Sequence, residues 1–334
     1  MSARSTDVVI VGAGFAGCAT AWALAQYGVR AIVLEREPEL GKHASGRGAG
    51  LGRQLADDDD TTGLTIRGAA MLRERFPHTW RESGGLLTFD DAAAANAYVD
   101  RARAFDVPHE IVDRSYVLRH WPLMIALPIE AALLVPRDGV IDIRGLLLSF
   151  SHDLAIDVGV GVTRIVPGGR GAIVETSHGP IETRVVVDAA GAWAGAATGD
   201  PPLTSLRRHL FLLETAPPID APYLWHLGAS EVYVRADGEG VLACPCDAEP
   251  TAAMDQPLSP DADDRLYGRI GRWRPEIAKR WACQRAFAGD RKMRIGRDPE
   301  RPWLVWASAL GGHGAPASPA VGERAAAAVL EVLG

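Results

Sequence analysis

The sequence predicts an α/β fold in which a Rossmann-like domain is joined to a second, α+β domain built on a mixed, largely antiparallel sheet. Three observations support this prediction. A glycine-rich turn joins a short apolar strand to a helix near the N-terminus, short strands fill residues 205–245, and a second glycine-rich turn precedes the last helix. The 334 residues are enough for about two domains of ordinary size.

The first element is a β-α-β unit. Residues 7–11 are a β-branched run typical of a strand buried on both faces. An apolar helical pattern follows and ends at Gly28, and residues 31–34 form a second buried strand that closes at Glu35. The turn between the first strand and the helix has the GxGxxG spacing of a dinucleotide site.

Each residue of this motif has a physical reason to be there. Gly12 permits the tight turn, Gly14 lets the backbone approach a pyrophosphate, and Gly17 lets helix and strand pack closely. The free N–H groups of the helix N-terminus favour phosphate. Glu35 can accept hydrogen bonds from both ribose hydroxyls, which favours NAD or FAD over NADP.

Later segments favour FAD. The small-residue loop over 41–50 suits a backbone that runs along an elongated ligand. The buried strand over 185–188 ends in small residues that could lie beside a cofactor, and a glycine-rich turn over 311–316 opens a last helix over 318–333. The dipole of that helix could stabilise negative charge on a reduced flavin.

The middle of the chain predicts the second domain. Runs at 210–213, 231–235 and 241–243 are typical of antiparallel strands. Helices are predicted over 67–76 and 91–105. The four acids at 57–60 indicate a solvated loop or the start of the helix that follows, where negative charge suits the dipole.

Composition excludes several other classes. The net charge is −7 and no stretch is rich in Lys and Arg, which disfavours a nucleic-acid surface. No run of about 18 apolar residues indicates a transmembrane helix, and a polar N-terminus argues against a secretory signal. The four cysteines form neither a disulfide framework nor a zinc pattern, so no metal and a cytoplasmic location are expected.

Six segments carry a resemblance that covers almost the whole chain: 34–37, 43–47, 188–193, 207–208, 281–287 and 311–314. On these segments the chain resembles the FAD-dependent amino-acid oxidase superfamily, which includes D-amino acid oxidases, glycine oxidase and sarcosine oxidases. Within it, the chain is most similar to D-amino acid dehydrogenases such as D-arginine dehydrogenase. The resemblance implies a discontinuous FAD-binding domain (1–80, 140–204 and 300–334) and a substrate domain (81–139 and 205–299).

Together with the motifs above, the resemblance implies a set of residues around a non-covalently held FAD. These are Gly12, Gly14, Ala16, Gly17, Glu35, Arg36, Ser45, Gly46, Arg47, Val162, Ala190, Gly191, Trp193, Gly311, Gly312, His313, Gly314 and Ala315. Cys283 lies near the position where sarcosine oxidases carry a cysteine joined to the flavin. The alternative is a small buried thiol.

The reaction implied is oxidation of the Cα–N bond of an amino acid, or of an N-substituted amino acid, to an imine by hydride transfer to flavin N5. The substrate carboxylate must be held, and a guanidinium does this bidentately. Arg208, Arg285 and Tyr233 match the family's substrate-binding positions. The alternatives are a surface pair for Arg207–Arg208 and a salt bridge of Arg285 with Asp290.

The chain departs from D-arginine dehydrogenase in three places. Leu51 and Ala56 stand where that enzyme has a loop histidine and tyrosine, and Gly85 or Leu86 replaces its guanidinium-binding glutamate. A cationic side chain would lack a counter-charge, so the sequence predicts a small, apolar or N-substituted amino acid as substrate. An unusual or carrier-bound amino acid is a further alternative.

Two other functions stay open on the sequence. An NAD(P)H-dependent flavin hydroxylase shares the N-terminal unit, although Asp138-Gly139 and Gly289-Asp290 lack the context of its further motifs. A flavin-binding subunit with impaired catalysis would also fit the departures. The electron acceptor (oxygen, or a quinone or dye), the stereochemistry of the substrate and the oligomeric state are left open.

Overall fold

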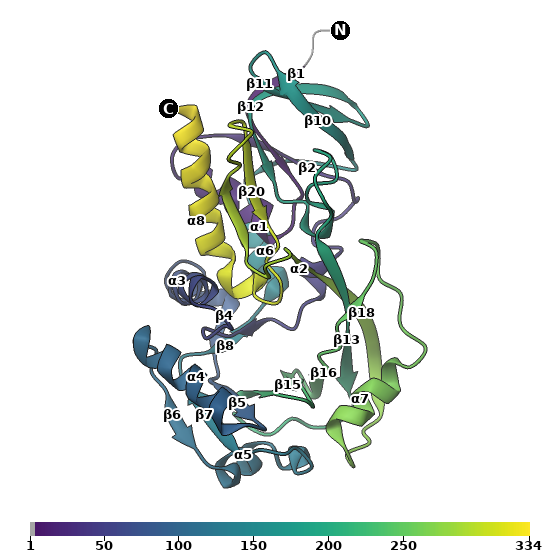
Figure 1. The fold of residues 1–334 in the computed structure, drawn as a ribbon. Coiled ribbons are helices and arrows are strands. Elements are labelled where there is room, and N and C mark those ends of the chain that lie inside the picture. The colour runs from purple at the N-terminus through teal and green to yellow at the C-terminus, as the bar shows by residue number, and fades with distance from the viewer. Residues whose placement is uncertain (1–3) are drawn as a thin grey trace.

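The computed structural model describes residues 4–334, so the first three residues of the predicted first segment lie outside the described part. Two bodies are stacked on each other (Figure 1), each built around its own sheet. The helices are α1 Phe15–Ala25, α2 Ala44–Arg47, α3 Asp59–Arg75, α4 Ala92–Ala104, α5 Arg114–His120, α6 Ile143–Ser151, α7 Ala262–Ile270 and α8 Gly314–Leu333.

The upper body in Figure 1 contains a sheet of eight strands with a parallel centre. Strand β1 lies between β2 and β12, and all three run parallel, as do the pairs β2–β9 and β12–β20. The edge is antiparallel at β10, β11 and β19. The strands are β1 Arg4–Val11, β2 Ala31–Glu35, β9 Ala155–Val158, β10 Val162–Gly168, β11 Gly171–Thr176, β12 Gly179–Asp188, β19 Arg294–Arg297 and β20 Leu304–Ser308.

The apolar runs of the sequence become the core of this sheet. Val8, Val9 and Ile10 of β1 are completely buried, because helices and strands cover both faces. Helices α1 and α8 pack against each other so closely that a Cβ on Gly322 would lie 2.4 Å from the carbonyl oxygen of Ala19. The predicted β-α-β unit is confirmed, with β1 beginning three residues earlier than expected.

The lower body contains a sheet of nine strands in the order β17-β13-β16-β15-β14-β5-β7-β6, with β18 beside β13. Most neighbours are antiparallel, and β14 with β5 is a parallel exception. The strands are β5 Gly85–Phe89, β6 Glu110–Val112, β7 Ala131–Val135, β13 Thr204–Leu213, β14 Tyr223–Leu227, β15 Val232–Asp237, β16 Gly240–Cys244, β17 Glu249–Pro250 and β18 Ile277–Phe287.

The two faces of the lower sheet have different neighbours. Helices α5 and α7 cover the outer face, where Val117, Trp121 and Leu266 join one hydrophobic cluster with strand residues. The opposite face carries Trp225 and Tyr233 in a second cluster, which turns toward the upper body. This second face is where the lower sheet can meet a ligand held by the upper one.

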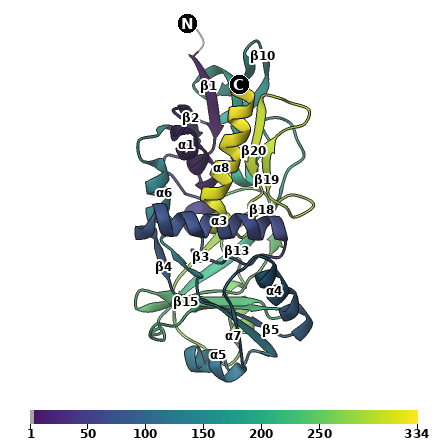
Figure 2. The ribbon, with the colours of Figure 1, turned by 90° about the vertical axis from the view of Figure 1, so that its left-hand side faces the viewer.

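Helix α3 lies between the two bodies (Figure 2), beside a small sheet of β3 Leu51–Gly52, β4 Trp80–Glu82 and β8 Gly139–Ile141. The acidic run begins this helix, since Asp58 accepts a hydrogen bond from the Thr61 N–H at 2.9 Å as its N-cap. A Cβ on Gly68 would lie 2.0 Å from the Pro316 carbonyl oxygen, so α3 packs directly on the start of α8.

The predicted sheet types are confirmed, and two helices begin well before their predicted starts. Helix α3 begins eight residues before the predicted start at 67, and α8 begins at Gly314, where its prolines obscured the helical pattern. The division of the chain into two domains stays a prediction. Strand β19 belongs to the upper sheet although it lies within the segment 205–299 assigned to the other domain.

Residues 4–334 contain neither a membrane-spanning helix nor a cluster of metal-binding side chains. No helix there has the length and apolar character needed to cross a bilayer. No group of three or more His, Cys, Asp or Glu side chains lies close enough together to bind a metal ion.

The packing of α1 generates a stability prediction. A Cβ on Gly17 would lie 1.9 Å from the Gly12 carbonyl oxygen, so Gly17→Ala should lower the free energy of unfolding by about 1–3 kcal/mol through overpacking. Gly63→Ala is the matched control, because its Cβ would meet only a Phe105 ring atom at 3.9 Å within a helix. It should raise stability by about 0.5–1 kcal/mol. Urea unfolding measures both, and equal effects would contradict the packing argument.

Candidate functional site

A cavity of about 330 Å³ lies between the two bodies. Its walls come from the ends of β1, β2, β12 and β20, from the start of α8, and from β14, β15 and β18 of the lower sheet. The carboxyl ends of parallel strands in one sheet share an edge, and ligands of open α/β sheets bind there. The cavity therefore occupies the position expected for a nucleotide cofactor.

The β1–α1 turn closes one side of the cavity. Gly12 has φ of +101°, and a Cβ there would lie 2.6 Å from the Ala189 carbonyl oxygen, so only glycine fits. Ser45 lies against Gly14 and its hydroxyl accepts a hydrogen bond from the Phe15 N–H at 2.9 Å. Gly12 and Gly14 thus let the backbone at the helix N-terminus line the cavity, where the Ser45 hydroxyl already accepts from one of its N–H groups.

Glu35 is positioned at the end of β2. One carboxylate oxygen accepts from the Ala13 N–H at 2.9 Å and the other from the Glu37 N–H at 3.0 Å. Next to it the Arg36 guanidinium lies 3.7 Å from the centre of the Trp193 ring. The orientation of Glu35 leaves its remaining lone pairs available to ribose hydroxyls.

The start of α8 forms the opposite end. His313 is the N-terminal cap residue of α8, and its Nε2 accepts a hydrogen bond from Arg53 Nη2 at 2.7 Å. Burial, together with the positive charges of Arg53 and Arg285, lowers the pKa of His313 to about 3. His313 is therefore neutral at physiological pH and acts here as a hydrogen-bond acceptor.

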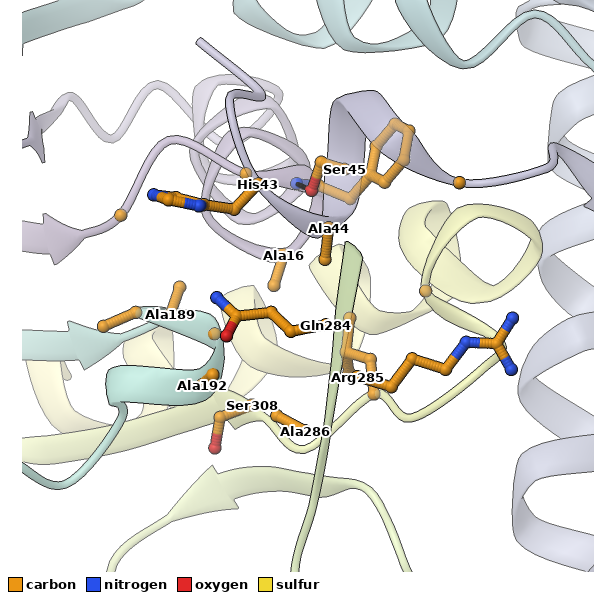
Figure 3. A pocket seen from close by; sticks show the side chains of 18 of the residues that line it. Ala16, His43, Ala44, Ser45, Ala189, Ala192, Gln284, Arg285, Ala286 and Ser308 are labelled. Atoms are coloured by element: carbon orange, nitrogen blue, oxygen red, sulfur yellow. Dashed lines mark hydrogen bonds between the residues drawn. The ribbon is translucent and has the colours of Figure 1, made fainter. Parts of the chain in front are cut away.

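The lower sheet supplies the wall that faces this end. Gln284 and Arg285 leave β18 on opposite sides (Figure 3), as successive strand residues do. A Cβ on Gly312 would lie 3.1 Å from Arg285 Nη1, so the guanidinium packs against the turn before α8. The Tyr233 hydroxyl is buried without a hydrogen-bond partner, and burial raises the pKa of Tyr233 well above its usual value. It remains a donor.

Arg208 lies behind this wall and does not line the cavity. It sits opposite Cys283 in the β13–β18 pairing, and its Nε donates to the Asp247 carbonyl oxygen at 3.1 Å. Asp247 is in turn held by His209 at 2.6 Å. Arg208 is therefore buried behind the lining residues, and its Nη1 has no hydrogen-bond partner.

The geometry agrees with neither alternative explanation for the arginines, a surface pair or a salt bridge with Asp290. Arg207 pairs with Glu249 at 2.7 Å and both Arg207 and Arg208 are buried, so they are not a surface pair. Within residues 4–334, no salt bridge joins Arg285 to Asp290, whose carboxylate accepts from the Lys292 N–H. Arg285 thus keeps its donors for the cavity.

Most residues implied by the sequence line the cavity: Gly12, Gly14, Ala16, Glu35, Arg36, Ser45, Val162, Ala190, Gly191, Trp193, Tyr233, Arg285, Gly311, Gly312, His313, Gly314 and Ala315. Gly17, Gly46, Arg47 and Arg208 do not. Gly17 and Gly46 serve backbone packing, since a Cβ on Gly46 would lie 2.1 Å from the Gly41 carbonyl oxygen. Arg47 ties its loop to Asp255 at 2.6 Å.

The lining residues that sequence reasoning missed include Arg53, Trp225, Gln284 and Ser308. Arg53 follows the glycine-rich loop without a motif around it, and its partners His313 and Trp225 are far away in the chain. The only local signal was an isolated basic residue between apolar and small ones, which a sequence does not distinguish from a surface arginine.

The cavity fits FAD on the features of the chain itself. Around the β1–α1 turn the backbone packs so closely that only glycine fits. Glu35 is oriented for ribose, and the N-termini of α1 and α8 face the two ends of the cavity. The Ser308 hydroxyl, at the end of β20, is buried in the lining without a partner, as expected where a ligand supplies one.

The sequence comparison agrees with this geometry. The chain belongs to the DAO family of FAD-dependent oxidoreductases, which it matches over residues 7–328. FAD is therefore the cofactor of this protein, and its reaction is an oxidation or reduction.

Individual relatives are more distant. Mouse mitochondrial sarcosine dehydrogenase is 29% identical over 74% of this chain, which spans only 29% of that protein's length. Monomeric sarcosine oxidase from Streptomyces avermitilis is 26% identical over 95% of this chain and 91% of its own. The L-proline dehydrogenase structure from P. horikoshii superimposes with a TM-score of 0.87 at 20% identity, covering 97% of this chain and 93% of that one. At that identity the likeness shows the shared fold.

A buried carboxyl holds the loop that carries Arg53. Asp138 is completely buried; it accepts from the Gln54 N–H at 3.1 Å, from Gln54 Nε2 at 3.0 Å and from the Tyr223 hydroxyl at 2.5 Å. Burial raises the pKa of Asp138 to about 6. The folded protein therefore takes up a proton here at a higher pH than the unfolded chain does.

This shift predicts a pH dependence. The pKa of Asp138 is about 6 in the folded protein and about 3.9 in the unfolded chain, so protonation of Asp138 stabilises the fold. This stabilisation is complete below about pH 3.9 and is lost as the pH rises through about 6. Relative to Asp138→Asn, which does not titrate, the wild type should gain about 2 kcal/mol between pH 7 and pH 4.5. Unfolding of both proteins with excess FAD measures the difference, and a difference independent of pH would contradict a titrating Asp138.

Proposed function

We propose that this protein is an FAD-dependent dehydrogenase or oxidase that converts the Cα–N bond of an amino acid, or of an N-substituted amino acid, to an imine. The observation that carries the proposal is the pair of Arg285 and Tyr233. Both lie on the lower sheet, both line the cavity, and neither has its polar atoms committed to another side chain of the described residues.

The pair suits a carboxylate. A guanidinium binds the two oxygens of a carboxylate with two parallel N–H bonds, and the Tyr233 hydroxyl adds a third donor. Because the pKa of Tyr233 is raised, its proton stays in place at neutral pH. A carboxylate bound here would fix the neighbouring α-carbon, and the flavin would supply the hydride acceptor, its N5.

The charges around the site also select the form of the amine. Arg53 and Arg285 flank His313, which is itself neutral. Positive charge disfavours an ammonium group nearby and lowers the pKa of a bound amine. The substrate would therefore lose its ammonium proton in the site, which exposes the nitrogen lone pair needed when the Cα–H bond breaks.

The relatives support a primary or secondary amine as donor. Sarcosine dehydrogenase and sarcosine oxidase are among the matched proteins, and a glycine oxidase from Geobacillus kaustophilus shares the fold with a TM-score of 0.83 at 22% identity. We include oxygen or a quinone as electron acceptor and a cytoplasmic location in the proposal. The four free thiols suit a reducing compartment.

Arg285→Ala tests the proposal. In this variant the best substrate should bleach the flavin at least about 100-fold more slowly under anaerobic conditions, because a charge-assisted contact with its carboxylate is lost. FAD should stay bound. Arg272→Ala is the control, since Arg272 is an exposed arginine of the same body. The panel contains D-, L- and N-methyl amino acids, and the stopped-flow decay of flavin absorbance is the measurement.

Unchanged bleaching in Arg285→Ala would reject the assigned site. Reduction of the flavin by NADPH alone, with no response to any amino acid, would instead support the hydroxylase alternative. A flavin that no donor reduces would support the catalytically impaired subunit.

The attachment of FAD is a separate prediction. Cys283 lines the cavity, but burial raises the pKa of its thiol to about 11. A covalent flavin bond requires the thiolate as nucleophile, and at neutral pH this cysteine is a thiol. Acid precipitation of the holoprotein should therefore leave all yellow colour in the supernatant. Colour retained in the pellet, and lost in Cys283→Ser, would contradict the prediction.

A further inference from the structure

We infer that the substrate carries two acidic groups: it is a dicarboxylic amino acid, free or N-substituted, whose second carboxylate is bound by Arg53. The inference rests on the proposed function, since it names the substrate class of the same site. It starts from a buried arginine that the oxidation of a simple amino acid does not require.

Arg53 is a fixed cation inside the cavity wall. Its side chain is 3% exposed, and its guanidinium carbon lies 4.0 Å from the centre of the Trp225 ring. Nη2 donates to His313, while Nε and Nη1 have no hydrogen-bond partner. A buried guanidinium with free donors costs several kcal/mol unless an anion pairs with it.

The acids near Arg53 pair with it only at long range and leave two of its donors without an acceptor. The nearest, Asp57, is 3.8 Å away from Nη2, its side chain is 77% exposed, and it accepts a hydrogen bond from Tyr98. Glu231 accepts from the Trp225 indole N–H at 3.0 Å. Asp57 forms a long salt bridge with Nη2, and the buried Asp138 bonds to Gln54 and Tyr223, so no carboxylate in the described part of the chain makes a hydrogen bond to Nε or Nη1 of Arg53.

The rest of the lining is equally poor in acids at this end. The acids that line the cavity among residues 4–334 are Glu35, Glu37 and Asp188. They lie on or just after β2 and at the end of β12, on the side that the ribose-binding Glu35 occupies. The substrate end carries Arg53 and Arg285, with Arg208 buried behind the wall.

One carboxylate therefore leaves one guanidinium unpaired. If Arg285 and Tyr233 bind the α-carboxylate, Nε and Nη1 of Arg53 still lack an acceptor, and a second carboxylate would accept a charge-assisted hydrogen bond from this guanidinium. The two guanidinium groups are close to each other, because Arg53 bonds to His313 and Arg285 packs against the adjacent Gly312. A short side chain such as that of aspartate or glutamate would bridge them.

This inference revises the small or apolar substrate predicted from the sequence. That prediction depended on the lack of a counter-charge for a cationic side chain. The structure agrees on this point, since no carboxylate of residues 4–334 lines the cavity beside Arg53 and Arg285. What the sequence did not show is that Arg53 and Arg285 line one end of the cavity without a carboxylate of the described residues in the lining there. An uncharged side chain would leave the free donors of Arg53 without an acceptor in a buried place.

The first experiment uses the wild-type holoenzyme and isosteric pairs. Aspartate and asparagine, and glutamate and glutamine, are compared as D-, L- and N-methyl forms in anaerobic flavin bleaching. The acid of the preferred series should bleach at least tenfold faster than its amide at sub-saturating concentration, since a charge-assisted pair is lost with the amide. Equal rates for acid and amide, or faster bleaching by amides, would overturn the inference while the proposed function stands.

A variant pair locates the second anion site. Arg53→Met keeps the apolar length beside Trp225 and removes the charge, so the preference for the acid over its amide should disappear. Arg53→Lys keeps the charge and should restore part of it. Retention of FAD and an unchanged circular dichroism spectrum show that the variants fold. A preference that survives in Arg53→Met would overturn the assignment to Arg53.

A binding experiment separates the inference from the proposed function. Succinate and butyrate have the same chain length and no amine, and their binding is followed by the change in flavin absorbance. Succinate should bind at least tenfold more tightly in the wild type and lose that advantage in Arg53→Met. This result would hold even if no amino acid reduced the flavin, which would reject only the proposed function. Equal affinity of the two acids would reject the second anion site.

Discussion

The rest of the structure depends on the close backbone approach at the turn from β1 into α1. Gly12 lies against the carbonyl group of Ala189 at the end of β12, and Gly17 lies against the carbonyl group of Gly12. No side chain fits at either place, so the helix N-terminus and the ends of two parallel strands meet at one edge of the upper sheet. The cavity opens at this edge, and the lower sheet closes it with the face that carries Trp225 and Tyr233. The backbone geometry at this edge therefore determines where FAD binds.

Charge divides the cavity into two functional ends. The lining carboxylates lie on the side of β2 and β12 together with Arg36 and Lys42, whereas the side of β18 and α8 carries Arg53 and Arg285 with no carboxylate among the lining residues that the structure describes. His313 accepts a hydrogen bond from Arg53, and burial with the nearby positive charges keeps it neutral. The same separation accounts for the expected preference for a neutral amine and for anionic groups around it. Both are consequences of placing fixed charges where water cannot screen them.

Fold and substrate are determined at different levels in this family. Proteins named for proline, glycine and sarcosine chemistry share the fold or the sequence pattern with this chain at 20–29% identity. In this chain the side chains that project from β14, β15, β18 and the 51–57 loop line the cavity without taking part in the backbone contacts around the β1–α1 turn. The glycines and the parallel strands are needed by any enzyme that holds FAD in this way, whereas Arg53 or Leu51 can change without disturbing them.

The sequence by itself determined the parts whose signals are local. The β-α-β unit, the FAD motif and the antiparallel strands of the second body could all be predicted, because period, glycine spacing and strand propensity act between near neighbours. It also supplied Arg285 and Tyr233 through a resemblance that spans the chain.

Only the tertiary structure decided that Arg208 lies behind the lining residues while Arg53 is one of them, and that Arg285 has no salt bridge with Asp290. The physical reason is that burial and charge balance depend on partners such as Trp225 and His313, which lie more than a hundred residues away and are brought to Arg53 only by folding.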